Sequence, residues 1–109
     1  MAFEIFKSKA GKFRFRLKAA NSQIILTSES YNDKGGAQNG VKSVQTNGPS
    51  ASNYESKTAK DGRTYFVLKA KNGQVIGTSQ MYKSRSGHSN GIKSVMVNSN
   101  SDVKDLTVE

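Results

Sequence analysis

The sequence predicts an α+β fold in which two tandem repeats build one antiparallel sheet, with two helices packed on one face. An offset of 51 residues aligns residues 3–50 with residues 54–101 without a gap, and 21 of the 48 aligned pairs are identical. Within each repeat the apolar residues first alternate, as in strands, and then recur at helical spacing. Hydrophobic residues make up 34% of the 109 residues, enough for one thin core between a sheet and its helices.

The two repeats are expected to share that core. A unit of about 51 residues is small for an independent hydrophobic core, and each copy of a tandem repeat is one supersecondary unit. We therefore predict a single domain over residues 1–109, made of repeat one (residues 1–51) and repeat two (residues 52–109).

Three strands are expected at the start of repeat one. Residues 3–7 alternate in part, and residues 13–19 alternate cleanly between apolar and basic side chains, which is the pattern of a half-buried strand. This alternation places three cations on one face: Arg14, Arg16 and Lys18. Residues 23–28 form the third strand, which is apolar on both faces.

The strands of each repeat are separated by turn residues. Gly11 lies in the first turn of repeat one, and Asn21–Ser22 forms the second. The counterparts in repeat two are Asp61–Gly62 and Asn72–Gly73, and Asn-Gly is the favoured pair of a two-residue type I′ hairpin turn.

A helix is expected over residues 31–47, where Ala37, Val41 and Val44 fall at positions i, i+4 and i+7. The corresponding residues of repeat two are His88, Ile92 and Val95. The N-terminal caps are expected from Asn32 or Asp33 in the first helix and from Ser84 or Ser86 in the second.

Glycines weaken the first helix. Gly35, Gly36 and Gly40 each cost about 1 kcal/mol relative to Ala if they lie inside it. Because Gly40 recurs as Gly91, we interpret this pair as a place where the helix backbone lies close against the sheet.

The remaining segments complete the sheet. Pro49 follows the first helix, where it cannot interrupt it, and residues 52–59 are predicted to form the next strand. Residues 103–108 alternate again and predict a final strand. We expect this strand to return and pair with repeat one, which closes a pseudo-twofold arrangement.

The two repeats carry a matching set of short segments. In repeat one they are residues 15–19 (Phe-Arg-Leu-Lys-Ala), 23–29 (Gln-Ile-Ile-Leu-Thr-Ser-Glu), Tyr31 and 40–44 (Gly-Val-Lys-Ser-Val). In repeat two they are residues 65–70, 74–80, Tyr82 and 91–95 (Gly-Ile-Lys-Ser-Val). In these residues the chain resembles the YegP-like family, small bacterial proteins built from a tandem domain of unknown function.

The resemblance implies a β(3)-α-β unit used twice, which forms a single sheet with exchanged C-terminal strands. Family members with one copy would form the same assembly as dimers. The resemblance brings no established activity, so it strengthens the fold and leaves the function open.

Composition limits the functional classes. The net charge of +9 favours polyanions as non-specific partners, although it can equally serve solubility. There is no Cys, no apolar run of the length of about 18 residues that spans a membrane, and no signal-like pattern at the start. We therefore expect a cytoplasmic protein that does not enter the membrane.

No motif in the sequence indicates an enzyme, and we predict no catalytic residue, cofactor or metal site. His88 is the only His and lacks the partner that a base or a ligand set requires, so we interpret it as a packing residue. Glu4 and Glu55 are flanked by Lys and are interpreted as solvated ion pairs. The glycines match neither phosphate-binding pattern, GxxxxGK[ST] or GxGxxG.

Nucleic-acid binding is one hypothesis for the basic strand face. Arg14, Arg16 and Lys18 are continued there by Lys69 and Tyr65, and a sheet face that mixes cations with an aromatic ring can follow phosphates and stack bases. Against this, Arg14 and Arg16 become Tyr65 and Val67 in repeat two, so the repeats do not present the same surface.

Repeated polar residues indicate a second kind of binding surface. Five such pairs exceed what a core needs: Lys18/Lys69, Tyr31/Tyr82, Asn39/Asn90, Lys42/Lys93 and Ser43/Ser94. Each pair also has a structural explanation, since a tyrosine ring can pack while its hydroxyl bonds the backbone. Phe6, Tyr65 and Val67 would lie on the uncovered sheet face, and an apolar patch there would mark an association surface, for which a homodimer is one hypothesis.

We predict a non-catalytic binding or structural module as the function, and non-specific nucleic-acid binding through the basic sheet face as the alternative. The partner-binding residues predicted from the sequence are Arg14, Arg16, Lys18, Lys69, Tyr31, Tyr82, Lys42 and Lys93.

Overall fold

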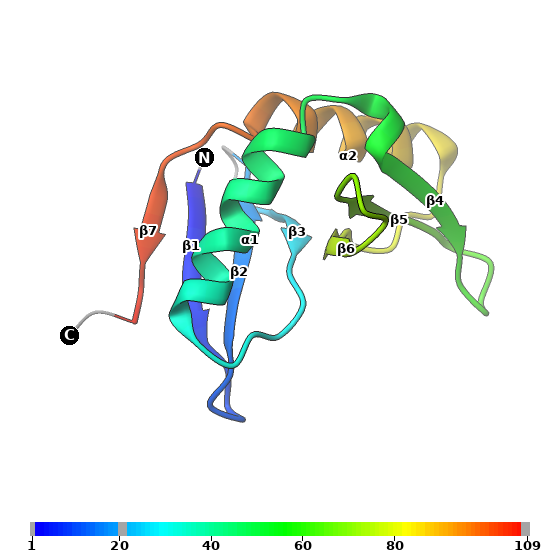
Figure 1. The fold of residues 1–109 in the computed structure, drawn as a ribbon. Helices are drawn as coiled ribbons and strands as arrows, with labels where there is room; N and C mark the ends of the chain where they lie inside the picture. Colours follow the sequence, from blue (N-terminus) through cyan, green and yellow to red (C-terminus); the bar gives the residue numbers. More distant parts are fainter. Residues whose placement is uncertain (1, 20–21, 108–109) are drawn as a thin grey trace.

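The two repeats form one sheet of seven strands in a computed structural model that describes residues 2–19 and 22–107 (Figure 1). The elements in chain order are β1 (Ala2–Lys7), β2 (Phe13–Lys18), β3 (Ile24–Thr27), α1 (Lys34–Asn47), the 3-10 turn η1 (Ala51–Asn53), β4 (Tyr54–Thr58), β5 (Thr64–Lys69), β6 (Val75–Thr78), α2 (Arg85–Asn98) and β7 (Val103–Asp105). The strands lie in the order β4-β5-β6-β3-β2-β1-β7.

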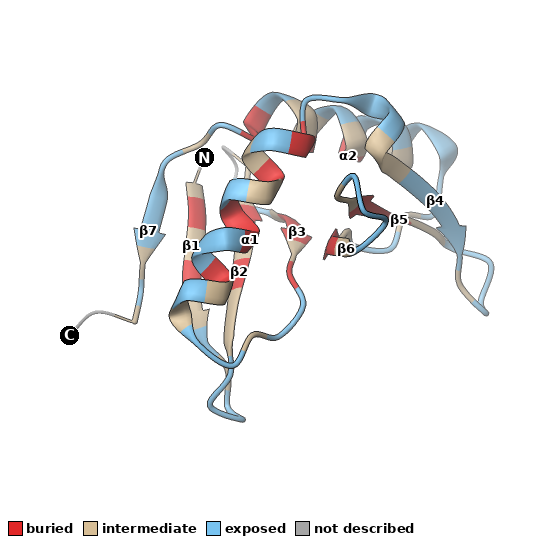
Figure 2. Cartoon of the chain, viewed as in Figure 1, coloured by how far each residue is buried: buried red, intermediate tan, exposed pale blue. Residues whose placement is uncertain are grey.

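The core lies between one face of the sheet and the two helices (Figure 2). The strand residues Phe3, Phe15 and Phe66 are fully buried there, and the helices contribute Val44 and Val95. α1 packs against β2 and β6, and α2 packs against β5 and β3, so each helix touches strands of both repeats. The predicted α+β fold with a shared core and two helices on one face is confirmed.

The repeats meet at the β3–β6 pair in the middle of the sheet. Leu26 of β3 is fully buried at this seam. A Cβ atom at Gly77 of β6 would lie 2.7 Å from Leu26 Cγ, so the glycine leaves the space that the leucine fills. Because Leu26 and Gly77 are counterparts at the offset of 51, only one repeat carries the large side chain here.

The last strand pairs with repeat one, as predicted, but in parallel. The Phe3 N–H donates to the Asp102 carbonyl and the Leu106 N–H donates to the Ile5 carbonyl, both at 2.8 Å, with Phe3 opposite Val103. The sheet is therefore mixed and not entirely antiparallel. The chain leaves α2 at the end of the sheet where β1 begins (Figure 1), so it can only run alongside β1 in the same direction.

Two predicted strands are shorter than expected. β7 ends at Asp105, because the Asp105 carboxylate accepts a hydrogen bond from the Thr107 N–H at 2.9 Å and the chain turns there; Val108, predicted as its last residue, lies outside the described residues. β4 begins at Tyr54 and not at residue 52, because Ala51–Asn53 form a 3-10 turn in which the Tyr54 N–H bonds the Ala51 carbonyl.

The hairpin turns differ from the prediction of a two-residue type I′ turn. The Gly73 N–H donates to the Ala70 carbonyl and the Ala70 N–H to the Gln74 carbonyl, both at 2.9 Å, so the loop has three residues. A type I′ turn needs positive φ at both central residues, but among the described non-glycine residues only Ser22 has positive φ. Asn21, predicted in the equivalent turn, lies outside the described residues.

The predicted caps and the close helix approach are confirmed. Asp33 accepts from the Gly36 N–H at 2.7 Å and Ser84 accepts from the Gly87 N–H at 3.0 Å. The helices therefore begin at residues 34 and 85, and the first begins later than the predicted residue 31. Asx and Ser caps of this kind satisfy a backbone donor that has no partner within the helix.

Within the described residues, no helix has the length and apolar content needed to cross a membrane.

We expect β7 to loosen as the pH falls from about 4 to about 2. Hydrogen bonds from Lys34, whose Nζ lies 2.8 Å from Asp105 Oδ2, and from Thr107 lower the pKa of Asp105 to about 2. A carboxyl group whose pKa is depressed by folding stabilises the folded state above its unfolded-state pKa, and this stabilisation is lost as the pH falls through the folded-state pKa. Amide chemical shifts of residues 103–106 should move towards random-coil values in this window.

The control variants separate Asp105 from general acid effects. Asp105→Asn should show loosened β7 shifts already at neutral pH and little further change on acidification. Asp61→Asn, in the β4–β5 turn, removes another carboxylate of lowered pKa and should leave the β7 transition in place. Unchanged β7 shifts between pH 5 and pH 2 in the wild type would contradict the role of Asp105.

Candidate functional site

Identical residues of the two repeats gather in two pockets on the helix side of the sheet. The pocket of repeat one has a volume of about 380 Å³ and is lined by Tyr31, Gly36, Asn39, Gly40, Ser43, Gln74 and Ile76, together with Glu29, Ser30 and Val75. The pocket of repeat two has a volume of about 250 Å³ and is lined by Tyr82, Gly87, Asn90, Gly91, Ser94, Gln23 and Ile25, together with Ala19. We call them the first and second paired pockets.

Most residues that line one paired pocket correspond, at the offset of 51, to residues that line the other. Adding 51 to positions 31, 36, 39, 40 and 43 gives positions 82, 87, 90, 91 and 94, and positions 23 and 25 give 74 and 76. The residue is the same in both repeats at each of these seven lining positions. Each pocket takes two of them from the hairpin of the other repeat, so it exists only when both repeats fold together.

The tyrosine of each pocket is held by backbone and ring contacts. Tyr31 and Phe13 exchange two backbone hydrogen bonds of 2.8 Å, and Tyr82 makes the same kind of bridge with Thr64. The Tyr31 ring stacks on Phe15 at 6.4 Å between centroids, with an interplanar angle of 12°. Its counterpart Tyr82 stacks on Phe66 in the same way, at 6.2 Å and 5°.

A glycine in each helix makes room for the tyrosine. A Cβ atom at Gly40 would lie 2.6 Å from Phe15 Cε2 and 2.7 Å from the Tyr31 hydroxyl, and a Cβ at Gly91 would lie 2.7 Å from Tyr82 Cζ. Real Cβ atoms do not approach other atoms so closely. The repeated glycine therefore lets the tyrosine hydroxyl reach the helix surface at the pocket floor.

The helix supplies the amide and hydroxyl groups beside the tyrosine. Asn39 and Ser43 are four residues apart on α1, so they lie on the same side of the helix, and Asn90 and Ser94 repeat this spacing on α2. Gln74, in the loop before β6, lines the first pocket together with Asn39 and Ser43. The lining positions shared by both pockets combine phenol, amide and hydroxyl groups, which bind through hydrogen bonds without a formal charge, and the first pocket adds the carboxylate of Glu29.

Both tyrosines remain protonated at neutral pH. Burial raises the pKa of Tyr31 and of Tyr82, and the carboxylate of Glu29 raises that of Tyr31 further. No group among the described residues makes a hydrogen bond with either tyrosine hydroxyl. Each hydroxyl can therefore donate a hydrogen bond to a bound molecule and accept one from it.

The cations predicted for nucleic-acid binding lie on the opposite, open face of the sheet. Arg16 Nε lies 2.7 Å and Lys18 Nζ 3.4 Å from Glu4 Oε1. In repeat two, Lys69 Nζ lies 2.6 Å from Glu55 Oε2. These contacts confirm that both glutamates form ion pairs. Glu55 is solvated as predicted, with 47% of its side chain exposed, whereas the Glu4 side chain is only 13% exposed.

The cations also lower the pKa of both glutamates. The hydrogen bond from Arg16 lowers the pKa of Glu4, and the one from Lys69 lowers that of Glu55. Arg16 also stacks over the Phe6 ring, 4.4 Å from its centroid. Arg14 lies apart from these pairs and donates to the Ser28 carbonyl at 2.8 Å.

The eight predicted partner-binding residues thus lie in three places. Tyr31 and Tyr82 belong to the paired pockets, and four cations occupy the open sheet face: Arg14, Arg16, Lys18 and Lys69. Lys42 and Lys93 are exposed on α1 and α2, and Lys42 lines a groove between α1 and β7. Gln23, Gln74 and the glycines were not predicted as site residues, although their identity at the offset of 51 is a signal that points to them.

His88 packs among aromatic rings. Its ring lies edge-on to Phe66 at 5.7 Å and to Tyr82 at 6.3 Å, which agrees with its interpretation as a packing residue. Among the described residues no three His, Asp or Glu side chains come together as a metal site requires.

The apolar residues expected on the uncovered sheet face are exposed to different degrees, and the homodimer stays a prediction. Val67 is only 4% exposed, whereas Phe6 and Tyr65 are half-buried. The exposed large apolar side chains among the described residues lie elsewhere: Met81, Val97, Val103 and Leu106.

Comparisons with known proteins show one family. A family model described as "Domain of unknown function (DUF1508)" matches the chain twice, over residues 8–55 and 59–105. The UPF0339 protein of Shewanella oneidensis is 53% identical over 106 residues, which cover 96% of both chains. The UPF0339 protein YegP of Yersinia pestis is 53% identical over 107 residues, which cover 97% of this chain and 96% of the relative.

Solved structures agree with the sequence relatives. The solution structure of the S. oneidensis UPF0339 protein matches with a TM-score of 0.89 at 52% identity, covering 95% of this chain and 89% of that one. The solution structure of YegP from Escherichia coli, described as a protein of unknown function, matches with a TM-score of 0.90 at 48% identity, covering 95% and 90%. The chain therefore belongs to the UPF0339 family, YegP-like proteins made of two DUF1508 repeats, and the function of these relatives is not established.

Gly40→Ala should destabilise the protein although Ala is the better helix former. The added methyl group would meet Phe15 and Tyr31 at distances below 3 Å, and such overpacking costs about 1–3 kcal/mol, more than the roughly 1 kcal/mol gained in helix propensity. The free energy of unfolding can be measured by urea denaturation.

Gly35→Ala is the matched control in the same helix. A Cβ at this position meets only Asp33 Oδ1, at 3.5 Å, so this variant should gain about 0.5–1 kcal/mol of stability. A Gly40→Ala protein as stable as Gly35→Ala would show that the tyrosine does not depend on the glycine.

Proposed function

We propose that this protein is a non-catalytic binding module whose two paired pockets each take a small uncharged molecule that presents hydroxyl or amide groups. One observation carries the proposal: the same residue stands at seven lining positions of both pockets. The two repeats are identical at only 21 of 48 aligned positions, whereas seven of the ten lining residues of the first pocket are identical to their counterparts.

The chemistry of the lining supports the class of ligand. Tyr31, Asn39, Ser43 and Gln74 offer donors and acceptors without a formal charge, and Ile76 adds apolar surface. Sites of this composition suit a neutral ligand, because buried polar groups of a binding site must be matched by partners on the ligand.

The titratable groups of the pockets support a non-catalytic role. The described lining contains the tyrosines and Glu29. Burial raises the tyrosine pKa, away from the neutral value that favours general acid–base catalysis. We keep a cytoplasmic location in the proposal because the sequence contains no Cys, and disulfides are characteristic of proteins outside the cytoplasm.

Amide chemical-shift titrations with N-acetylglycinamide and with methyl glucoside should identify the paired pockets. We expect saturable shifts at Asn39, Ser43 and Gln74 and at their counterparts Asn90, Ser94 and Gln23. Tyr31→Phe should weaken binding at the first pocket about fivefold to tenfold, since it removes one hydrogen bond of about 1 kcal/mol, and should leave the second pocket unchanged.

Tyr65→Phe is the control for this titration. It also removes a phenol hydroxyl, but on β5 and on the opposite face of the sheet, so binding should remain at the wild-type level. The proposal fails if a screen of neutral amides and polyols gives no saturable shift in either pocket, or if Tyr31→Phe and Tyr65→Phe act alike.

A second candidate function is non-specific nucleic-acid binding through the open sheet face. The strand registers place six cations on this face against two carboxylates, Glu4 and Glu55. The cations are Arg14, Arg16, Lys18, Lys57, Lys69 and Lys104. Phe6 and Tyr65 add aromatic rings on which bases can stack.

Glu4→Gln should strengthen the binding of a single-stranded oligothymidine if this second function holds. The substitution frees Arg16 and Lys18 from their ion pairs, so affinity should rise about twofold to fivefold at about 50 mM salt and fall more steeply with added salt. Asp61→Asn makes the same change of charge in the β4–β5 turn. An equal gain with Asp61→Asn would mean that only net charge matters and would contradict a binding face.

A further inference from the structure

The outer edge of β4 is the open counterpart of the edge that β7 covers. By the offset of 51, residues 54–58 of β4 correspond to residues 3–7, which include the β1 residues that pair with β7. β4 is the last strand on its side of the sheet (Figure 1), and four of its five residues are exposed (Figure 2). It contains no proline and pairs with β5 over five consecutive residues without a bulge, so it lacks two features that commonly block edge strands.

The backbone of β4 presents hydrogen-bonding groups to this edge. The Phe66 N–H donates to Ser79 Oγ and its carbonyl accepts from the Ser79 N–H, both at 2.9 Å, so both groups of Phe66 point towards β6. Ser56 lies opposite Phe66, and in an antiparallel pair its own N–H and carbonyl then point away from β5. Ile5, the counterpart of Ser56, uses its carbonyl to bind the Leu106 N–H.

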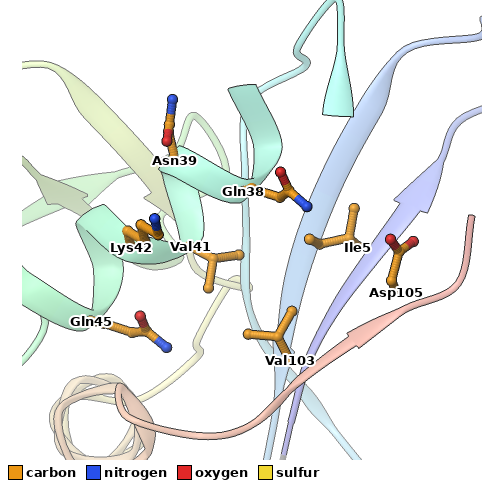
Figure 3. A pocket seen from close by; sticks show the side chains of 8 residues that line it. All are labelled: Ile5, Gln38, Asn39, Val41, Lys42, Gln45, Val103 and Asp105. Atoms are coloured by element: carbon orange, nitrogen blue, oxygen red, sulfur yellow. The ribbon is translucent and has the colours of Figure 1, made fainter. Parts of the chain in front are cut away.

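β7 shows how such an edge is filled in repeat one (Figure 3). Val103 of β7 lies beside Ile5 and Val41 in a groove of about 390 Å³ between α1 and the sheet edge. Two residues later, Asp105 forms an ion pair of 2.8 Å with Lys34 at the start of α1. The strand that completes repeat one therefore carries an apolar residue and, two positions on, an acidic residue, both facing the helix.

The equivalent groove of repeat two keeps an apolar residue and a cation at the corresponding helix positions and has no strand in it. It has a volume of about 500 Å³ and is lined by Ser56, Lys57, Thr58, Thr64, Lys83, Ser84, Arg85, His88, Ser89 and Ile92. Ile92 stands in place of Val41, and Arg85 stands in place of Lys34. The lining contains Lys57, Lys83 and Arg85 and no carboxylate. Lys57 pairs with Glu55 at 3.8 Å, so Lys83 and Arg85 are the cations that favour an acidic ligand. Ser56 replaces Ile5 and leaves room for a larger apolar side chain.

We propose that the β4 edge binds an extended, acidic segment of a partner protein as an additional parallel strand. The segment carries an apolar residue that packs over Ile92 and, two positions later, an Asp or Glu that pairs with Arg85. Strand addition supplies backbone hydrogen bonds, and alternate side chains supply specificity. An Arg–carboxylate pair adds strength and geometric selectivity. This site is separate from the paired pockets and does not depend on the function proposed for them.

The test uses fluorescence anisotropy with the full chain and a labelled peptide of the sequence of residues 100–109, which contains the Val-Lys-Asp pattern of β7. Arg85→Glu should weaken binding at least tenfold, and a peptide with Asp105→Lys should recover most of that loss on the Arg85→Glu protein. Lys34→Glu is the matched control in repeat one. If Lys34→Glu weakens binding and Arg85→Glu does not, the peptide exchanges with β7 on β1, and the proposal is overturned.

Backbone-methylated peptides test strand addition on the unaltered protein. β7 directs the N–H of Leu106, and by alternation that of Lys104, towards its neighbour. N-methylation at the Lys104 position should therefore weaken binding about tenfold, while N-methylation at the Val103 position should change it less than twofold. Equal effects would exclude a strand at this edge.

Two further outcomes overturn the proposal. One is no binding up to about 1 mM by this peptide or by versions with Leu or Phe at the Val103 position. The other is a concentration-dependent dimer, detected by analytical ultracentrifugation, that Ser56→Pro abolishes and that excludes the peptide, since the edge would then pair with a second copy of this chain. A monomer that binds the peptide with the expected variant pattern supports the proposal.

Discussion

The packing of Leu26 over Gly77 at the β3–β6 seam is the constraint on which the single core depends. Neither repeat is long enough to bury its apolar face alone, so both helices reach across this seam to strands of the other repeat. The seam has room for one large side chain, because a Cβ at Gly77 would overlap Leu26. The two copies are therefore similar in fold but cannot be identical in sequence where they touch.

The same crossing of the seam creates the paired pockets. Gln74 and Ile76 complete the pocket of repeat one, and Gln23 and Ile25 complete that of repeat two. In contrast, the sheet edges break the symmetry, because the end of repeat one continues directly into β4 while the end of repeat two is free to lie against β1. The β1 edge is thus covered by β7, whose Asp105 pairs with Lys34. The β4 edge is open.

Local features of the fold followed closely from local chemistry. Asp33 and Ser84 act as caps because their side chains satisfy backbone donors within three residues. The recurrence of Gly40 as Gly91 predicts a close approach of the helix to the sheet, because glycine destabilises a helix interior unless close packing requires it. In the structure Gly40 packs against Phe15 and Tyr31. The turns were less predictable: Asn72–Gly73 suits two different hairpin loops, and the strand register with its bulge after Leu68 selects the longer one.

The sequence by itself determined the repeat, the strands and helices and the buried face of each, since these depend on residue type and on spacing within a short stretch. The partners of Glu4 and Glu55 in their ion pairs depend on strand pairing, because Arg16, Lys18 and Lys69 lie on the neighbouring strands. Only the tertiary structure decided that β7 runs parallel to β1, that Val67 is buried, and that Tyr31 and Gln74 line one pocket. These features depend on contacts between segments that are distant in the sequence. Hydrophobic periodicity predicts which face of an element a residue lies on, but not which residue of another strand or helix lies next to it.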